Sequence, residues 1–293
     1  MSDPILNIPG AIQFNLRAAR TLWAPEQLPD DLHVAYVQGA EMFARAVARA
    51  QQNAGLKVDG KLGPITLATL NRLQVKPVAK PYLRGIDVSG YQNRPNFDFA
   101  KLATAGLSFA FVKLTQESFR SNKDAEWQVD AFYDMGLAVG FYHFCDVSES
   151  ASRQAELLHR EAQKFARGRP YLPLAADYEW LDDHNHLAST AHRAWVAEMV
   201  SRLRTLDRRD PILYTGPNMW RQYLKTPIPE LGDVHLWVVD YSKPEAPPTL
   251  PPGFKDWRFR QFTGSGRVPG YSGDIDLNFF NGDQAALSKL TEA

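Results

Sequence analysis

Two carboxylates, Asp177 and Glu179, stand two residues apart at the end of an apolar run that begins at Tyr171. Side chains alternate between the faces of a β-strand, so both point the same way, with Cα atoms roughly 6.6 Å apart, and Tyr178 points the opposite way. Carboxyl groups this close repel each other, so one tends to keep its proton while the other stays charged. Such a pair suits glycoside hydrolysis, in which an acid protonates the leaving oxygen and a carboxylate supports the cation-like transition state.

The apolar run predicts a buried strand, one of a series from Arg84 onward. The expected strands are 85–89, 108–114, 137–144, 172–179, 212–215, 236–240, 258–262 and 274–279. The expected helices are 97–105, 124–135, 148–166 and 190–206, the last with an apolar stripe. Repeated βα units predict a parallel sheet, and eight strands in roughly 210 residues suggest a closed barrel whose last part has lost its helices. We therefore expect an α/β fold, with the barrel over 84–293.

The first part of the chain predicts a separate, small all-helical domain over residues 1–75. Asp30 and Asp31 could open a long helix that ends near Gly55, and Asp59-Gly60 is a turn signal. Gly63-Pro64 indicates the start of another helix. Residues 76–83 carry two prolines and no helical period, which predicts a short, semi-rigid linker.

Nearly every expected barrel strand ends in polar side chains, and in a barrel these ends converge on one mouth. Those side chains are Asp87, Lys113, Thr115, Tyr142, His143, Asp177, Glu179, Tyr214, Asp240, Gln261 and Asp276. Independent strand ends have no reason to share this property, so its recurrence predicts a site.

Composition narrows the possible functions. Lys+Arg and Asp+Glu both number 33, so the net charge of zero gives no reason to expect a nucleic-acid partner. The only cysteine, Cys145, excludes an intrachain disulfide. The N-terminus has no signal-peptide pattern, and no stretch is apolar over the roughly 18 residues of a membrane span. We expect a monomer that is made in the cytoplasm and needs no cofactor or membrane.

Residues 38–73 closely resemble the peptidoglycan-binding domain of bacterial and phage wall hydrolases, whose pattern runs helix, Gly-Leu, Asp-Gly, x-x-Gly-Pro, x-Thr, helix. The resemblance implies that Asp59, Gly60, Gly63 and Thr66 contribute to cell-wall binding.

Residues 84–281 resemble glycoside hydrolase family 25, the Chalaropsis-type lysozymes. The motifs that carry the resemblance are GIDVS with Gln92, VKLT at 112–115, GFYHF at 140–144, ADYE at 176–179, LYTG at 213–216, LWVVD at 236–240 and GYSGDIDLN at 270–278. The family implies a (β/α)5β3 barrel and N-acetylmuramidase (lysozyme) activity on peptidoglycan.

Matched to the family's motifs, Glu179 is the expected general acid/base and Asp177 its partner carboxylate. Asp87 and Asp240 match two further acidic residues at the mouth. Substrate contacts are expected from Tyr142, Tyr214, Lys113, Gln261, Asp276 and Trp180. The chain departs from the family at Gln116-Glu117, where Glu-Gly is usual, and the missing glycine leaves the shape of that loop open.

The expected mechanism has two versions. Glu179 protonates the oxygen between N-acetylmuramic acid and N-acetylglucosamine, with its pKa raised by the neighbouring acids. Then either Asp177 attacks directly, or the substrate's N-acetyl group attacks while Asp177 orients it. The resemblance favours net retention, and we favour the assisted route.

Other interpretations stay open at this point. His184 and His186 beside two aspartates could bind a metal, although a polar loop is commoner, and we expect no metal site. Cys145 with His143 could suggest a cysteine peptidase. The chain could also be a non-catalytic wall-binding protein, or a hydrolase of another N-acetylated glycan such as chitin. A leaderless wall hydrolase fits a phage endolysin released by a holin, or a toxin delivered by a secretion system and countered by an immunity protein; both act in the periplasm or outside the cell.

Overall fold

The computed structural model describes residues 8–21, 32, 40–53, 55–63, 66–67, 82–179, 187–242, 244 and 246–292. The chain divides into two compact units, Met1–Pro81 and Tyr82–Ala293. The second unit begins two residues earlier than the sequence predicts. The Tyr82 ring, assigned to the linker, packs against Trp257 and Phe279, with ring centroids 5.0 and 5.3 Å apart. Residues 76–81 of the expected linker lie outside the described residues.

The first unit contains helices α1 (Ile8–Thr21) and α3 (Ala40–Asn53), which contact each other. Phe43 and Val47 of α3 are buried, as their helical spacing predicts. The expected helix start at Asp30 and Asp31 lies outside the described residues.

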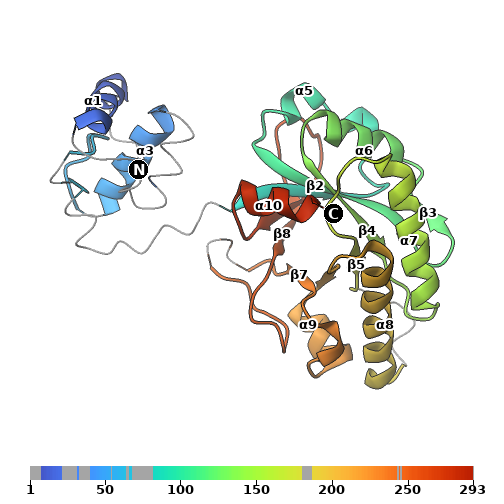
Figure 1. The fold of residues 1–293 in the computed structure, drawn as a ribbon. Helices are drawn as coiled ribbons and strands as arrows, with labels where there is room; N and C mark the ends of the chain where they lie inside the picture. Colours follow the sequence, from blue (N-terminus) through green and yellow to red (C-terminus); the bar gives the residue numbers. More distant parts are fainter. Residues whose placement is uncertain are drawn as a thin grey trace. The chain divides into compact units, whose positions relative to one another are not determined.

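Eight strands of the second unit form a closed barrel (Figure 1). They are β1 (Leu83–Val88), β2 (Leu107–Gln116), β4 (Ala138–Phe144), β5 (Ala175–Asp177), β6 (Ile212–Thr215), β7 (His235–Val239), β8 (Phe259–Gly266) and β9 (Ile275–Phe280). Neighbouring strands are parallel, except that β9 runs antiparallel to both β8 and β1. The parallel pairing of β1 with β2 closes the barrel. A two-residue strand, β3 (Arg120–Ser121), forms a hairpin with the end of β2 and was not expected.

Helices follow the first five barrel strands. They are α5 (Phe99–Leu102), α6 (Ala125–Asp134), α7 (Ala151–Ala166), α8 (Ser189–Asp207) and α9 (Pro217–Met219), with short turns η2 (Arg94–Asn96), η3 (Trp220–Leu224) and η4 (Pro229–Leu231). The strands β7, β8 and β9 then follow with no further α-helix between them in the described residues. This matches the expected five βα units followed by three strands.

Side-chain caps start several of these helices. Ser150 accepts a hydrogen bond from the Arg153 N–H at the start of α7. Asp283 does the same for Ala286 N–H at the start of α10 (Gln284–Thr291), a C-terminal helix that the sequence analysis missed. No helix among the described residues has the length and apolar character needed to cross a membrane.

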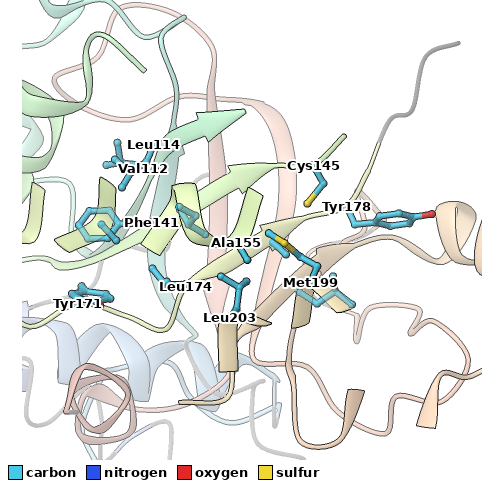
Figure 2. Close-up of a cluster of buried hydrophobic side chains, with 14 of the residues drawn as sticks. Val112, Leu114, Phe141, Cys145, Ala155, Tyr171, Leu174, Tyr178, Met199 and Leu203 are labelled. Carbon is cyan, nitrogen blue, oxygen red and sulfur yellow. The ribbon is translucent and has the colours of Figure 1, made fainter. Parts of the chain in front are cut away.

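The main hydrophobic core lies between the barrel and its helices. α6, α7 and α8 lie side by side along the barrel (Figure 1). Figure 2 shows Leu114 and Phe141 of the strands facing Ala155, Met199 and Leu203. The apolar stripe expected in the helix after the fourth strand therefore packs against the barrel, as predicted.

A second, aromatic core fills the end of the barrel interior at which the parallel strands begin. Its largest members are Phe109, Phe111, Trp237, Phe259 and Phe280. Phe111 stacks on Trp237 with ring centroids 4.3 Å apart. Because these rings fill that end of the interior, polar side chains are left the opposite end, where the parallel strands finish.

Gly140 makes room for this aromatic core. A Cβ at residue 140 would overlap with the ring of Phe111. We expect Gly140→Ala to lower the free energy of unfolding by about 1–3 kcal/mol, the usual range for overpacking, measured by urea denaturation. Gly140→Ala/Phe111→Leu should recover part of the loss. An unchanged stability in Gly140→Ala would contradict this account of the interior.

Candidate active site

A cavity of about 210 Å³ opens at the carboxyl ends of the barrel strands. Its lining comes from all eight barrel strands and from loops next to them. The lining residues are Asp87, Ser89, Tyr91, Lys113, Tyr142, Phe144, Asp177, Glu179, Tyr214, Trp237, Tyr241, Gln261 and Asp276. We call this space the acid cavity, because four of its lining side chains are carboxylic acids.

Asp177 and Glu179 lie on the same face, as the strand alternation predicts. Both line the acid cavity. Tyr178 points the opposite way, into the helix layer, where its hydroxyl lies 3.0 Å from Nδ1 of His192 (Figure 2). Asp177 is only 6% exposed, and among the described residues its Oδ1 has no hydrogen-bond partner. A buried oxygen without a partner is uncommon in folded proteins and marks Asp177 as a candidate functional residue.

Asp87 is fixed by amide donors from the last two strands. Its Oδ2 accepts hydrogen bonds from Nε2 of Gln261 (3.0 Å) and from Nδ2 of Asn278 (2.7 Å). Asn278 is held in turn by Nε1 of Trp237, which donates to its Oδ1 at 2.8 Å. The carboxylate is thus held in one orientation at the base of the acid cavity.

Burial shifts the proton affinity of all four acids upward. It raises the pKa of Glu179 to about 7, with the charge of Asp87 adding to the effect and that of Lys113 opposing it. It raises the pKa of Asp276 to about 8, with Asp87 and Glu179 adding to it, and that of Asp87 to about 6. Burial and Glu179 also hold the pKa of Asp177 well above its usual value. The cavity therefore retains protons near neutral pH.

Lys113 is the cation among the lining residues of the acid cavity. Its Nζ donates to Oε1 of Gln116 at 2.7 Å and lies 4.3 Å from the centre of the Phe144 ring. Next to it, Glu117 adopts φ 56°, in the left-handed region that glycine favours. The residue that replaces the family's usual glycine thus adopts a backbone conformation that glycine favours.

Thr115 and His143, two of the expected mouth residues, lie outside the barrel interior. A register shift in β2 between Lys113 and Thr115 places Thr115 opposite His143. His143 Nδ1 lies 2.7 Å from Oγ1 of Thr115, and its Nε2 lies 2.7 Å from Oε1 of Gln154 on α7. Burial lowers the pKa of His143 to about 4, so this pair fastens a strand to a helix.

Asp240 is not part of the acid cavity, contrary to the sequence prediction. It shares the outer face of β7 with Leu236 and Val238. Its carboxylate accepts hydrogen bonds from the N–H groups of Ser242 (2.8 Å) and Thr249 (2.6 Å). Burial works to raise the pKa of Asp240, but these donors hold it below its usual value.

Asp240 instead helps to hold the loop after β7. Arg260 fastens the same loop from outside the barrel by donating to the carbonyl oxygens of Asp240, Ser242 and Ala246. The fourth acid of the cavity is Asp276, which the sequence analysis assigned to substrate contact.

This difference predicts opposite outcomes for two matched substitutions. We expect Asp276→Asn to lower kcat about tenfold or more, because the carboxyl group that it removes lines the water-poor acid cavity together with Glu179 and Asp87. Asp240→Asn should keep kcat within about twofold. Turnover of soluble glycan fragments measures both, and a larger kcat loss in Asp240→Asn than in Asp276→Asn would reverse the assignment.

The expected substrate residues on the strands also line the cavity. The hydroxyls of Tyr214 and Tyr241 both donate to Oε1 of Gln261, at 3.0 and 2.6 Å. Tyr142 packs edge-on against Trp237. Asn278 and Tyr241 were not predicted as site residues. The sequence does contain a signal for Asn278, which follows Asp276 by two residues and therefore shares its face of the strand. Trp180 lies outside the described residues.

The environment of Cys145 does not fit the cysteine-peptidase interpretation. Cys145 is buried, its Sγ donates to the carbonyl of His143 at 3.7 Å, and burial holds its pKa well above the usual value. A thiol in this state is not an activated nucleophile. The proposed ligands His184 and His186 lie outside the described residues, and the described part of the chain holds no cluster of three metal-binding side chains.

Comparison with known proteins identifies the barrel. The sequence model of "Glycosyl hydrolases family 25" matches residues 86–271. The chain belongs to glycosyl hydrolase family 25. "Lysozyme M1" of Streptomyces globisporus is 29% identical over 82% of this chain and 81% of that protein. The bacterial lysozyme structure from Streptomyces coelicolor is 28% identical, covers 72% of this chain and 97% of that one, and superposes with a TM-score of 0.64.

The chain is also similar to a protein from a fungus. The "N,O-diacetylmuramidase" of Arthroderma benhamiae is 24% identical over 72% of this chain and 87% of that protein. With its family shown, this protein is a peptidoglycan-hydrolysing glycoside hydrolase of the lysozyme type, and the acid cavity is its candidate active site.

The N-terminal unit of this family 25 enzyme matches a second model, "Putative peptidoglycan binding domain", over residues 38–70. Its signature residues build their own loop. Nε2 of Gln51 donates to the side chains of Asp59 (3.0 Å) and Thr66 (3.2 Å), and the N–H of Gly60 donates back to Gln51 Oε1 (2.9 Å). Gly60 has φ 69°, and the carbonyl of Gly63 accepts from Leu67 N–H. These contacts show how the loop folds; the role of the four residues in wall binding stays a prediction.

Proposed function

We propose that this enzyme is an N-acetylmuramidase that cuts the β-1,4 bond between N-acetylmuramic acid and N-acetylglucosamine with net retention. The observation that carries the proposal is the pair Asp177 and Glu179, which line one cavity together with Asp87 and Asp276. The family membership supplies the substrate class.

Glu179 acts first as the general acid. Because burial raises its pKa to about 7, much of it is protonated at neutral pH, and it donates that proton to the glycosidic oxygen as the bond to C1 breaks. The carbonyl oxygen of the substrate's own N-acetyl group attacks C1, and the carboxyl group of Asp177 accepts the N–H of that group. Water then opens the cyclic intermediate at C1, and the Glu179 carboxylate takes its proton.

Product analysis tests the bond and the mechanism together. Mass spectrometry of fragments from purified peptidoglycan should find reducing N-acetylmuramic acid ends, and NMR should find the β-anomer first. Reducing N-acetylglucosamine ends would change the bond, and cut peptide stems would require a peptidase instead. An α-anomer as the first product would reject retention. Wall binding without release would favour a non-catalytic binding protein.

A chemically altered substrate separates the two routes to retention. Glycan strands whose N-acetyl groups have been removed lack the attacking carbonyl oxygen. The assisted route requires them to resist cleavage, whereas direct attack by Asp177 would still cut them.

We further propose that the enzyme acts on the cell wall in the periplasm or outside the cell as a monomer. A phage endolysin route needs a holin, and a toxin route needs a secretion system and a cognate immunity protein. Expression in the periplasm with and without candidate immunity proteins would distinguish the two settings.

A further inference from the structure

A second hollow, of about 260 Å³, adjoins the acid cavity. The two share Ser89, Tyr91 and Lys113, so they lie on opposite sides of the same residues. The far wall of the hollow is formed by Ser121 of β3 and by the following residues Asn122 and Lys123. We call this space the rim hollow. It lies where a substituent of a sugar in the acid cavity could extend.

The sign of the charge reverses between the two spaces. The acid cavity contains four carboxylic acids, whereas none of the residues lining the rim hollow is acidic and two of them, Lys113 and Lys123, are cations. Lys123 is exposed, and its ammonium forms no ion pair or hydrogen bond in the described part of the chain. The following residue, Asp124, directs its Oδ1 to Nε1 of Trp127 (3.3 Å).

Hydrogen bonds hold the rim hollow in shape. Nδ2 of Asn122 donates to the carbonyl of Lys113 (2.8 Å) and to Oε1 of Gln128 (3.0 Å). Nε2 of Gln128 donates to the carbonyl of Ser89 (2.7 Å). These bonds tie together the ends of β1 and β2 and the start of α6. A ligand group would therefore meet a wall that is already ordered, which lowers the entropy lost on binding.

We propose that the rim hollow binds a carboxylate of the peptide stem that is attached to the muramic acid residue in the acid cavity. The proposal rests on the proposed function. A further N-acetyl sugar is neutral and has no need of two ammonium groups, whereas a stem peptide carries carboxylates on the lactyl side of the sugar. Tyr91 (86% exposed) lines both spaces, so its ring is accessible at the boundary between them.

The test compares two substrates that differ only in the charge of the stem. One is soluble glycan strands with their peptides, and the other is the same strands after the stem carboxylates have been converted to amides. We expect KM of the wild type to be about fivefold lower for the strands with free stem carboxylates, the factor given by one solvent-exposed charge pair. In Lys123→Gln that ratio should fall close to one, and in Lys123→Glu it should reverse.

The control is Lys289→Gln, an exposed lysine on α10 that lines neither space, and it should keep the wild-type ratio. All variants carry the same N-terminal unit, so wall binding by that unit cancels. The ratio should also shrink at high ionic strength. Equal KM values in the wild type, or an unchanged ratio in Lys123→Gln, would overturn the proposal. Failure of the wild type to cut either substrate would instead reject the proposed function.

Discussion

Glu179→Gln is expected to lower kcat by about three orders of magnitude, within the range that a positioned general acid contributes. Glutamine has nearly the same shape and keeps the packing, but it cannot give a proton to the glycosidic oxygen. Burial holds the pKa of Glu179 near 7, so the wild-type group is suited to that step at neutral pH. Release of soluble fragments from labelled peptidoglycan measures the loss.

The control for this substitution is Glu230→Gln, which removes an exposed carboxylate on η4 and should leave kcat unchanged. Sedimentation with intact walls should show that Glu179→Gln still binds, since the N-terminal unit is untouched. Normal turnover by Glu179→Gln would remove Glu179 from the mechanism and, with it, the assignment of the acid cavity.

The second large effect concerns stability. Folding raises the pKa of Asp87, Glu179 and Asp276 above their ordinary values, so between about pH 4 and 8 the folded state binds more protons than the unfolded chain. The free energy of unfolding must then fall as pH rises through that window. We expect the free energy of unfolding to fall by about 2 kcal/mol between pH 5 and 8. This is less than the sum of the separate pKa shifts would give, because the repulsion between two acids appears in the pKa shift of each but counts only once.

Asp276→Asn isolates this contribution. The amide cannot ionise, so the variant should lose less stability than the wild type between pH 5 and 8 and should become the more stable of the two at pH 8. Urea unfolding at both pH values measures the difference. If the free energy of unfolding changed by the same amount with pH in both proteins, Asp276 would not contribute to the pH dependence of stability.

The alternation of strand faces was the most reliable guide from sequence to site. It placed Asp177 and Glu179 together and Tyr178 apart. Applied to β7 it would also have excluded Asp240, since Trp237 and Val239 face the interior and Asp240 follows the opposite parity. The face on which a side chain lies is therefore a better predictor of a site residue than its position at the end of a strand.

Other features depend on contacts that no local pattern encodes. The apolar run 172–179 predicted a long strand, yet β5 comprises only Ala175–Asp177, because its extent is set by the pairing of β4 and β6. The shift that turns Thr115 outward arises from the pairing of β2 with β4. The packing of Phe111 against Gly140 joins residues on different strands. The order of the segments and the number of barrel strands could be predicted from the sequence. The lengths of the strands and their registers could not, because they are set by pairing in the closed barrel.

The closure of the barrel also sets when the enzyme becomes active during its synthesis. Asp87 lies on the first strand, and the two amides that hold it, Gln261 and Asn278, follow 174 and 191 residues later. On the ribosome, where chains fold from the N-terminus onward, Asp177 and Glu179 emerge long before β9. Until β9 pairs with β1 and β8, those strands have open edges and Asp87 has no support. A nascent chain is therefore latent, and catalytic competence arrives with its last strand.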